Sequence, residues 1–146
     1  GAETEAFKDR LRLDSGRIDQ ITKSLKEVVR LQDPVGEITD RKKLKNGLNI
    51  LKMRAPLGVL MVVFESRPNV CIEAFSIAYK SGNAVLLRGG KESRETVRVL
   101  VDLIRESLKI CGQSETCALA VLDPDRDLLR SLLTAHKYID VVIPRG

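Results

Sequence analysis

Four short apolar runs follow Pro56, and segments of helical length separate them. The runs are Val59–Phe64, Ala84–Leu87, Ala118–Leu122 and Ile139–Ile143. Near-continuous apolar runs of this kind are typical of strands that are covered on both faces, and right-handed crossovers between them make the sheet parallel. The alternation therefore predicts an α/β fold, a Rossmann-like parallel sheet with alternating helices.

The segments between these runs have the spacing of amphipathic helices, because their apolar residues recur every three or four positions. In the first, these residues are Ile72, Phe75, Ala78 and Tyr79, and Asn69 is expected to cap the helix. In the second, which ends at Gly112, they are Val97, Leu100, Val101, Ile104 and Leu108. The third begins after Asp123-Pro124 and is expected to bury Leu128, Leu129, Leu132 and Leu133.

Two further elements are predicted before the sheet. A helical stripe runs from Ser15 to Leu31, with Asp14 or Ser15 placed to cap its start. Within Val35–Arg54, the turn signal Asn46-Gly47 lies between two short runs, which predicts a pair of extended pieces joined as a hairpin.

The loop after the first apolar run is a candidate binding segment, since ligands of open α/β sheets lie outside the carboxyl ends of the strands. Its residues are Glu65, Ser66, Arg67, Pro68 and Asn69. The planar guanidinium of Arg67 suits a carboxylate or a phosphate. The alternative is that these residues have no binding role and only form a loop that caps a helix, with Arg67 in solvent.

The second run ends in Arg88-Gly89-Gly90-Lys91, which places two cations around two glycines before a predicted helix. Backbone N–H groups at a helix start favour an anion, and glycine lets the backbone approach it. NAD enzymes place an acidic group near this strand end, whereas a basic group accepts the 2′-phosphate of NADP, so Lys91 with Arg88 favours NADP. A solvated basic turn is the alternative. Neither a G-x-G-x-x-G after the first run nor a P-loop motif occurs.

Composition makes several classes of function improbable. The formal charge is +5, but Lys and Arg are spread along the chain and aromatic residues make up 3% with no Trp, which disfavours nucleic acid as a partner. No apolar run is long enough to span a membrane, and the N-terminal residues lack the apolar core of a signal peptide. We therefore expect a cytoplasmic protein that does not bind a membrane.

Three cysteines and one histidine do not form the paired spacing of a metal site, so no metal is expected. Cys71, Cys111 and Cys117 are interpreted as buried or half-buried thiols rather than nucleophiles. Of the three, Cys71 is the best candidate for a reactive thiol, because it follows a strand-end loop in the first turn of a helix, where a thiolate is favoured. His136 is interpreted as structural.

Five segments together match a known family in order and spacing. They are DPVGEI at 33–38, NGL at 46–48, PLGVLMVVFESRPNV at 56–70, KSGNAVLLRGGKES at 80–93 and YIDVVIPRG at 138–146. In these segments the chain resembles the gamma-glutamyl phosphate reductases, also called glutamate-5-semialdehyde dehydrogenases, of the aldehyde dehydrogenase superfamily. The resemblance implies reduction of L-glutamyl 5-phosphate by NADPH to L-glutamate 5-semialdehyde, on the route to proline. It also implies a cysteine thiol that attacks the acyl phosphate and forms a thioester, which hydride then reduces.

The same resemblance implies roles for the residues at the strand ends. Glu65 and Ser66 would border the cofactor cleft, and Arg67 and Asn69 would face the substrate. The remaining implied cofactor contacts are Arg88, Gly89, Gly90, Lys91, Pro144, Arg145 and Gly146. The superfamily also suggests a homo-oligomer.

The family's reactive cysteine lies in a separate catalytic domain beyond the segment at 138–146. The resemblance therefore implies that residues 1–146 are a fragment, a single partial NADP-binding domain without the nucleophile, and that this chain contains no catalytic residue. Two alternatives stay open: an inactive domain that acts only in oligomerisation or binding, and a bifunctional synthase, for which a mitochondrial location is also expected.

Overall fold

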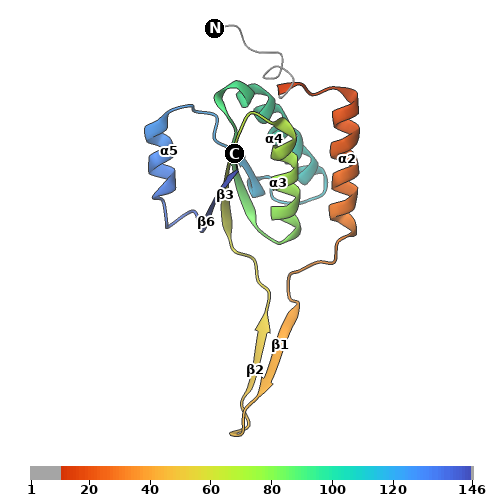
Figure 1. The fold of residues 1–146 in the computed structure, drawn as a ribbon, viewed down its shortest axis with the longest axis vertical. Helices are drawn as coiled ribbons and strands as arrows, with labels where there is room; N and C mark the ends of the chain where they lie inside the picture. The colour runs from red at the N-terminus through yellow and green to blue at the C-terminus, as the bar shows by residue number, and fades with distance from the viewer. Residues whose placement is uncertain (1–10, 146) are drawn as a thin grey trace.

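A four-stranded parallel sheet forms the centre of the molecule (Figure 1). The computed structural model describes residues 11–145. The strands are β3 (Val59–Phe64), β4 (Ala84–Arg88), β5 (Ala118–Ala120) and β6 (Val141–Arg145), and they lie in the order β5-β4-β3-β6. The chain thus proceeds outward from β3 in one direction and then returns to place β6 on the other side of β3. The predicted α/β sheet is confirmed.

Helices cover both faces of the sheet. α3 (Pro68–Lys80) and α4 (Arg94–Ile110) lie on one face, and α2 (Ser15–Arg30) packs on the outside of α3. The short helix α5 (Arg126–Leu133) lies on the opposite face (Figure 1). This placement follows from the reversal between β5 and β6, because a right-handed crossover in the opposite direction puts its helix on the other face.

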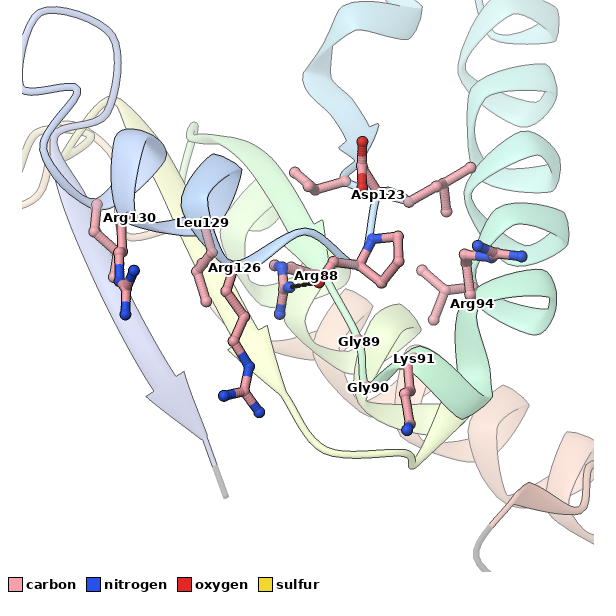
Figure 2. Close-up of a pocket in the computed structure, with 14 residues that line it drawn as sticks. Arg88, Gly89, Gly90, Lys91, Arg94, Asp123, Arg126, Leu129 and Arg130 are labelled. Carbon is pink, nitrogen blue, oxygen red and sulfur yellow. Dashed lines mark hydrogen bonds between the residues drawn. The ribbon is translucent and has the colours of Figure 1, made fainter.

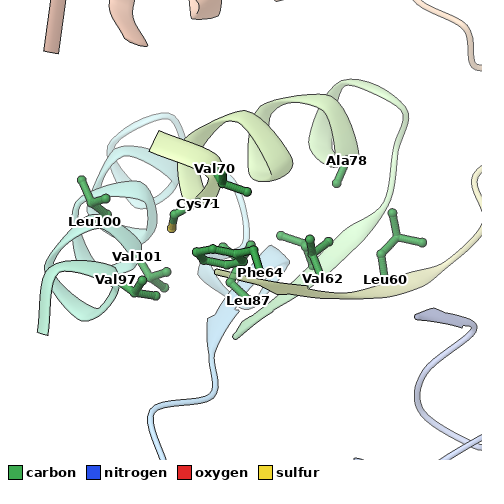
Figure 3. Packing of buried hydrophobic residues seen from close by; sticks show 11 residues of the cluster. Leu60, Val62, Phe64, Val70, Cys71, Ala78, Leu87, Val97, Leu100 and Val101 are labelled. Carbon is green, nitrogen blue, oxygen red and sulfur yellow. The ribbon is translucent and has the colours of Figure 1, made fainter. Parts of the chain in front are cut away.

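The core lies between the sheet and the pair α3 and α4 (Figure 3). Alternate residues of β3 point into it, whereas the fully buried Met61 lies outside this cluster, as the alternation of side chains along a strand requires. The apolar stripe predicted for α4 is buried throughout. The buried cluster consists of Leu60, Val62, Phe64, Val70, Cys71, Ala78, Val85, Leu87, Val97, Leu100 and Val101.

The predicted helix and hairpin before the sheet are both present. α2 begins at Ser15, and the Asp14 carboxylate accepts a hydrogen bond from the backbone N–H of Arg17 at 3.0 Å. The antiparallel strands β1 (Ile38–Lys43) and β2 (Asn49–Met53) form a ribbon that extends away from the sheet, with every residue exposed (Figure 1). Asn46 accepts a hydrogen bond from the N–H of Leu48 in the turn.

The starts of β3, β4 and β6 are joined by two polar side chains. The buried Asn83 accepts hydrogen bonds from the backbone N–H groups of Leu57 and Gly58, at 2.6 and 2.9 Å. Asp140 accepts one from the N–H of Val59 at 2.8 Å. These bonds fix the strands where they enter the sheet, and they therefore align the opposite ends, where ligands of such sheets bind.

Several details differ from the sequence prediction. Asn69 is not the cap of α3: Pro68 occupies the first helical turn, for which its fixed φ is suited, so Arg67 becomes the N-cap and Asn69 lies inside the helix. β5 ends at Ala120 rather than Leu122, and β6 begins at Val141 rather than Ile139.

The leucines of α5 are not buried as predicted. Leu128, Leu129 and Leu132 are half-buried and Leu133 is exposed, because a hollow separates part of this helix from the strand ends. No helix among residues 11–145 is long and apolar enough to cross a membrane.

Candidate functional site

The carboxyl ends of all four parallel strands lie along one edge of the sheet, and the loops that follow them form the candidate site. The chain leaves β3 toward β4 on one side, whereas β6 lies on the other side of β3. Open α/β sheets bind their ligands at such a reversal of strand order. Figure 2 shows the part of this edge that follows β4 and β5.

The two loops that the sequence singled out contact each other. The Ser66 hydroxyl donates a hydrogen bond to the Glu92 carboxylate at 3.1 Å. A Cβ atom on Gly90 would lie 2.5 Å from the Ser66 Oγ, and one on Gly89 would lie 2.7 Å from the Ser93 Oγ. Neither glycine has a positive φ, so both are explained by the close packing of the chain's own loops. Their approach to a phosphate stays a prediction.

A single turn of 3-10 helix, Lys91–Ser93, connects the glycines to α4. Ser93 is fully buried, and its hydroxyl donates to the carbonyl of Gly90 at 3.0 Å. No side chain makes a capping hydrogen bond at the start of either this turn or α4. No capping side chain therefore occupies the backbone N–H groups at this helix start. An anion site requires such groups to be available to the ligand.

A hollow of about 350 Å³, which we call the basic hollow, lies beside this loop between α4, α5 and the ends of β4 and β5 (Figure 2). Its wall has an apolar part, formed by Val97, Val121, Leu129 and Leu133 among others, and one acidic residue, Asp123. Its cations are Arg88, Lys91, Arg94, Arg126 and Arg130.

The positive charge of the basic hollow is only partly neutralised by the chain itself. Arg130 pairs with Asp127 at 2.8 Å, but Lys91 lies 3.9 Å from Glu92 with 79% of its side chain exposed. Arg126 has no ion pair or hydrogen bond to residues 11–145. Arg88 donates a long hydrogen bond of 3.4 Å to the Pro124 carbonyl, and its Nε is buried without a partner in the described chain. The surplus charge suits an anionic ligand.

Two further hollows adjoin the loop after β3. One of about 280 Å³, the switch-point hollow, lies between the ends of β3 and β6 and is lined by Glu65, Arg67, Asn69, Val70 and Arg145. The other, of about 410 Å³, is the polar hollow between the first turns of α2 and α3, which Arg67 and Asn69 also line.

The predicted site residues thus fall into separate groups. Arg88, Gly89, Gly90 and Lys91 line the basic hollow, and Ser66 bridges to it through Glu92. Glu65, Arg67, Asn69 and Arg145 line the switch-point hollow. Pro144 lies in β6 opposite Val63, and Gly146 lies outside the described residues.

The cysteines differ in exposure. Cys71 is fully buried, and burial raises the pKa of its thiol to about 12, so it stays protonated and inert. Cys117 is half-buried as expected, whereas Cys111, at the end of α4, is exposed, contrary to the prediction. Within residues 11–145, no group of three or more His, Cys, Asp or Glu side chains could hold a metal ion.

Sequence reasoning missed the cations that α4 and α5 add to the basic hollow. Arg126, Leu129, Arg130 and Leu133 lie three or four positions apart, so they share one side of α5. The same spacing in the sequence, directly after a strand-end loop, was a usable signal for these residues. Arg94 follows Lys91 by one turn and was available from the same pattern.

Comparison with known proteins finds that the chain is similar to part of several gamma-glutamyl phosphate reductases. No protein-family model matches it. The gamma-glutamyl phosphate reductase of Actinobacillus pleuropneumoniae is 46% identical over 141 residues, which are 97% of this chain and 34% of that protein. The reductase of Salmonella newport is 44% identical over 143 residues, 98% of this chain and 34% of the relative. The chain therefore spans about a third of the length of the curated relatives it matches.

Solved structures agree in fold. The gamma-glutamyl phosphate reductase of Thermotoga maritima has a TM-score of 0.94 at 39% identity, covering 99% of this chain and 35% of that one. The reductase of Saccharomyces cerevisiae has a TM-score of 0.87 at 33% identity, with coverages of 100% and 37%. An engineered glycolyl-CoA reductase with bound NADP⁺ shares the fold alone, since its sequence identity is 19%. Its TM-score is 0.65, and the match covers 93% of this chain and 35% of that one. Over the third of the relatives' length that it spans, this chain matches the gamma-glutamyl phosphate reductases in both sequence and fold.

Proposed function

We propose that this chain is the cofactor-binding part of a cytoplasmic reductase that uses NADPH to convert L-glutamyl 5-phosphate to L-glutamate 5-semialdehyde in proline biosynthesis. The similarity to gamma-glutamyl phosphate reductases supports the reaction. The observation that carries the cofactor assignment is the basic hollow, whose cations are only partly neutralised by the chain. A glycolyl-CoA reductase of the same fold is known with bound NADP⁺, which agrees with a nicotinamide cofactor.

The residues present fit such a cofactor. Arg88, Lys91 and Arg126 would hold the 2′-phosphate, since guanidinium and ammonium groups are its natural partners. Apolar side chains such as Val97 and Leu129 would receive the adenine ring. When bound, the cofactor supplies a hydride for an acyl carbon. The buried Nε of Arg88, which has no partner in the described chain, would gain one from an anionic ligand.

The substrate would lie at the switch-point hollow, where Arg67 and Arg145 provide positive charge for an acyl phosphate. These groups would stabilise the phosphate as it leaves, when a thiolate attacks the acyl carbon and the carbon–oxygen bond to phosphate breaks. Cys71 does not serve as that thiolate, because its raised pKa and burial keep it protonated. The nucleophile would come from the part of the family's length that this chain does not span.

Exchange of charge at Lys91 tests the cofactor assignment. Lys91→Glu removes an exposed contact of up to about 1 kcal/mol and adds a repulsion of about 1 kcal/mol against the 2′-phosphate. Because about 1.4 kcal/mol corresponds to a tenfold change, the Kd for NADPH should rise about 30-fold. The Kd for NADH should stay the same or fall. Isothermal titration of both cofactors measures this.

Lys45→Glu is the matched control, because Lys45 is exposed in the turn of the β1–β2 hairpin, outside the residues that line the basic hollow. It should leave both cofactor affinities unchanged. Equal losses for NADPH and NADH in Lys91→Glu would refute the assignment of the 2′-phosphate. Equal losses in both variants would show that only the net charge matters.

One observation favours a second role, homo-oligomerisation, with or without catalysis. The β1–β2 ribbon extends from the domain and exposes apolar side chains, including Ile50, Leu51 and Met53. Exposed apolar surface of this kind is typical of an interaction site. Sedimentation velocity should find an oligomer that Leu51→Asp dissociates. A monomer at all concentrations would refute this role.

A further inference from the structure

We propose that the polar hollow between α2 and α3 binds the amino-acid end of the substrate, an α-ammonium group together with its α-carboxylate. This inference rests on the proposed function, because it concerns the same substrate. The hollow measures about 410 Å³. It combines arginines with one carboxylate, and a zwitterionic amino acid requires that combination of charges.

Glu73 provides the negative group. It lies in the second turn of α3 and is half-buried, and one of its oxygens accepts a hydrogen bond from the Asn69 side chain at 3.1 Å. That bond fixes the orientation of the carboxylate. The other oxygen has no partner within residues 11–145, so it is available to accept a hydrogen bond from an ammonium group.

The positive groups come from two elements. Arg12 and Arg17 line the hollow from the α2 side, and Arg67 lines it from the loop before α3. Arg12 engages Asp14 through its Nε at 3.4 Å, which leaves the terminal nitrogens of its guanidinium for another partner. Arg67 makes no hydrogen bond or ion pair with its side chain in the described chain. A carboxylate is the natural ligand for the Arg12 guanidinium, and Arg67, which also lines the switch-point hollow, stays available to the acyl phosphate.

Position links this hollow to the reaction. Arg67 and Asn69 line both the polar hollow and the switch-point hollow, so the two hollows are neighbours on either side of these side chains. An elongated substrate can therefore place its acyl phosphate at the strand ends and its amino-acid group between the helices. Glu73 would then select substrates that carry an ammonium group, and Arg12 those that carry a carboxylate.

Binding of L-glutamate and of glutarate, which lacks the ammonium group, tests the inference. Glu73→Gln keeps an acceptor for Asn69 but removes the negative charge. It should weaken L-glutamate binding about tenfold, as expected for the loss of one charge-assisted hydrogen bond, and leave glutarate binding unchanged or stronger. Chemical-shift titration of the 15N-labelled chain measures both affinities, and the shifted amides should lie in the first turns of α2 and α3.

Glu106→Gln is the control, because Glu106 is an exposed carboxylate on α4 outside the polar hollow, and it should change neither affinity. Equal weakening of L-glutamate and glutarate by Glu73→Gln, or shifts confined to other elements, would overturn the inference. So would a wild-type chain that binds NADPH at Lys91 but does not bind L-glutamate. Loss of the NADPH response would instead count against the proposed function.

Discussion

Replacing Gly58 by alanine is expected to destabilise the domain by about 4 kcal/mol, because two independent costs coincide there. Gly58 has a φ of +119°, which L-residues rarely adopt and which costs about 1–3 kcal/mol. A Cβ atom at this position would also overlap the carboxylate of Asp140, whose Cγ would lie 2.8 Å away. The carboxylate must move aside, which breaks a hydrogen bond to a charged group that is worth about 1.5–3 kcal/mol. Asp140 accepts the N–H of Val59, so the overlap also disturbs the junction of β3 and β6.

Gly47→Ala separates the two costs. Gly47 has a φ of +91°, but nothing lies within 4 Å of its added Cβ, so only the backbone cost of about 1–2 kcal/mol applies. Urea unfolding followed by circular dichroism measures both variants, and Gly58→Ala should lose about 2 kcal/mol more than Gly47→Ala. In the double variant with Asp140→Ala, the two losses should be less than additive, because Gly58→Ala already breaks the hydrogen bond of Asp140. Equal free energies of unfolding for Gly58→Ala and Gly47→Ala would refute the account of this junction.

Other expected outcomes concern the cysteines and Asn83. A thiol reagent should modify Cys111 quickly, Cys117 more slowly and Cys71 only after unfolding. Fast modification of all three thiols in the folded chain would contradict the burial of Cys71. Burial raises the pKa of Cys71 from 9.0 to about 12, so this thiol loses its proton at lower pH in the unfolded chain than in the folded one. The free energy of unfolding should therefore fall as pH rises from 9 toward 12. In Cys71→Ala, the part of this decrease that comes from Cys71 should be absent. Asn83→Ala should lower the free energy of unfolding in urea by about 2–4 kcal/mol, because it leaves the N–H groups at the start of β3 without their acceptor. A decrease of less than about 1 kcal/mol would contradict this role of Asn83.

The periodicity of the sequence was sufficient for most of the fold. The uniform stripe of α4 and the exact extent of β3 followed from apolar spacing alone, because both elements pack directly against the main core. The burial of α5 was overpredicted for the opposite reason. Leu133 has the apolar spacing of a buried helix face, but α5 borders the basic hollow. Periodicity predicts which side of a helix faces inward, but it does not predict how closely that side packs against the sheet.

The candidate site was predicted in part. Loops that directly follow strands are visible in a sequence, so the apolar pattern is sufficient to predict Arg67, Arg88 and Lys91 as site residues. Arg126 was missed because its proximity to Arg88 depends on the crossover from β5 to β6, which places the start of α5 beside the ends of β4 and β5. Glu73 was missed because its relation to Arg12 depends on how α2 packs against α3, and neither sequence segment indicates that pairing.

The most direct test of the central claim follows the 2′-phosphate of NADP⁺ itself by 31P NMR. Its second pKa is ordinarily about 6. Contact with Arg88, Lys91 and Arg126 favours the dianion, so the bound 2′-phosphate should titrate at a lower pH than the free cofactor, and Lys91→Glu should reverse part of that shift. A 2′-phosphate that titrates as it does in free NADP⁺, while the pyrophosphate resonances respond to the protein, would contradict the claim that the basic hollow holds it.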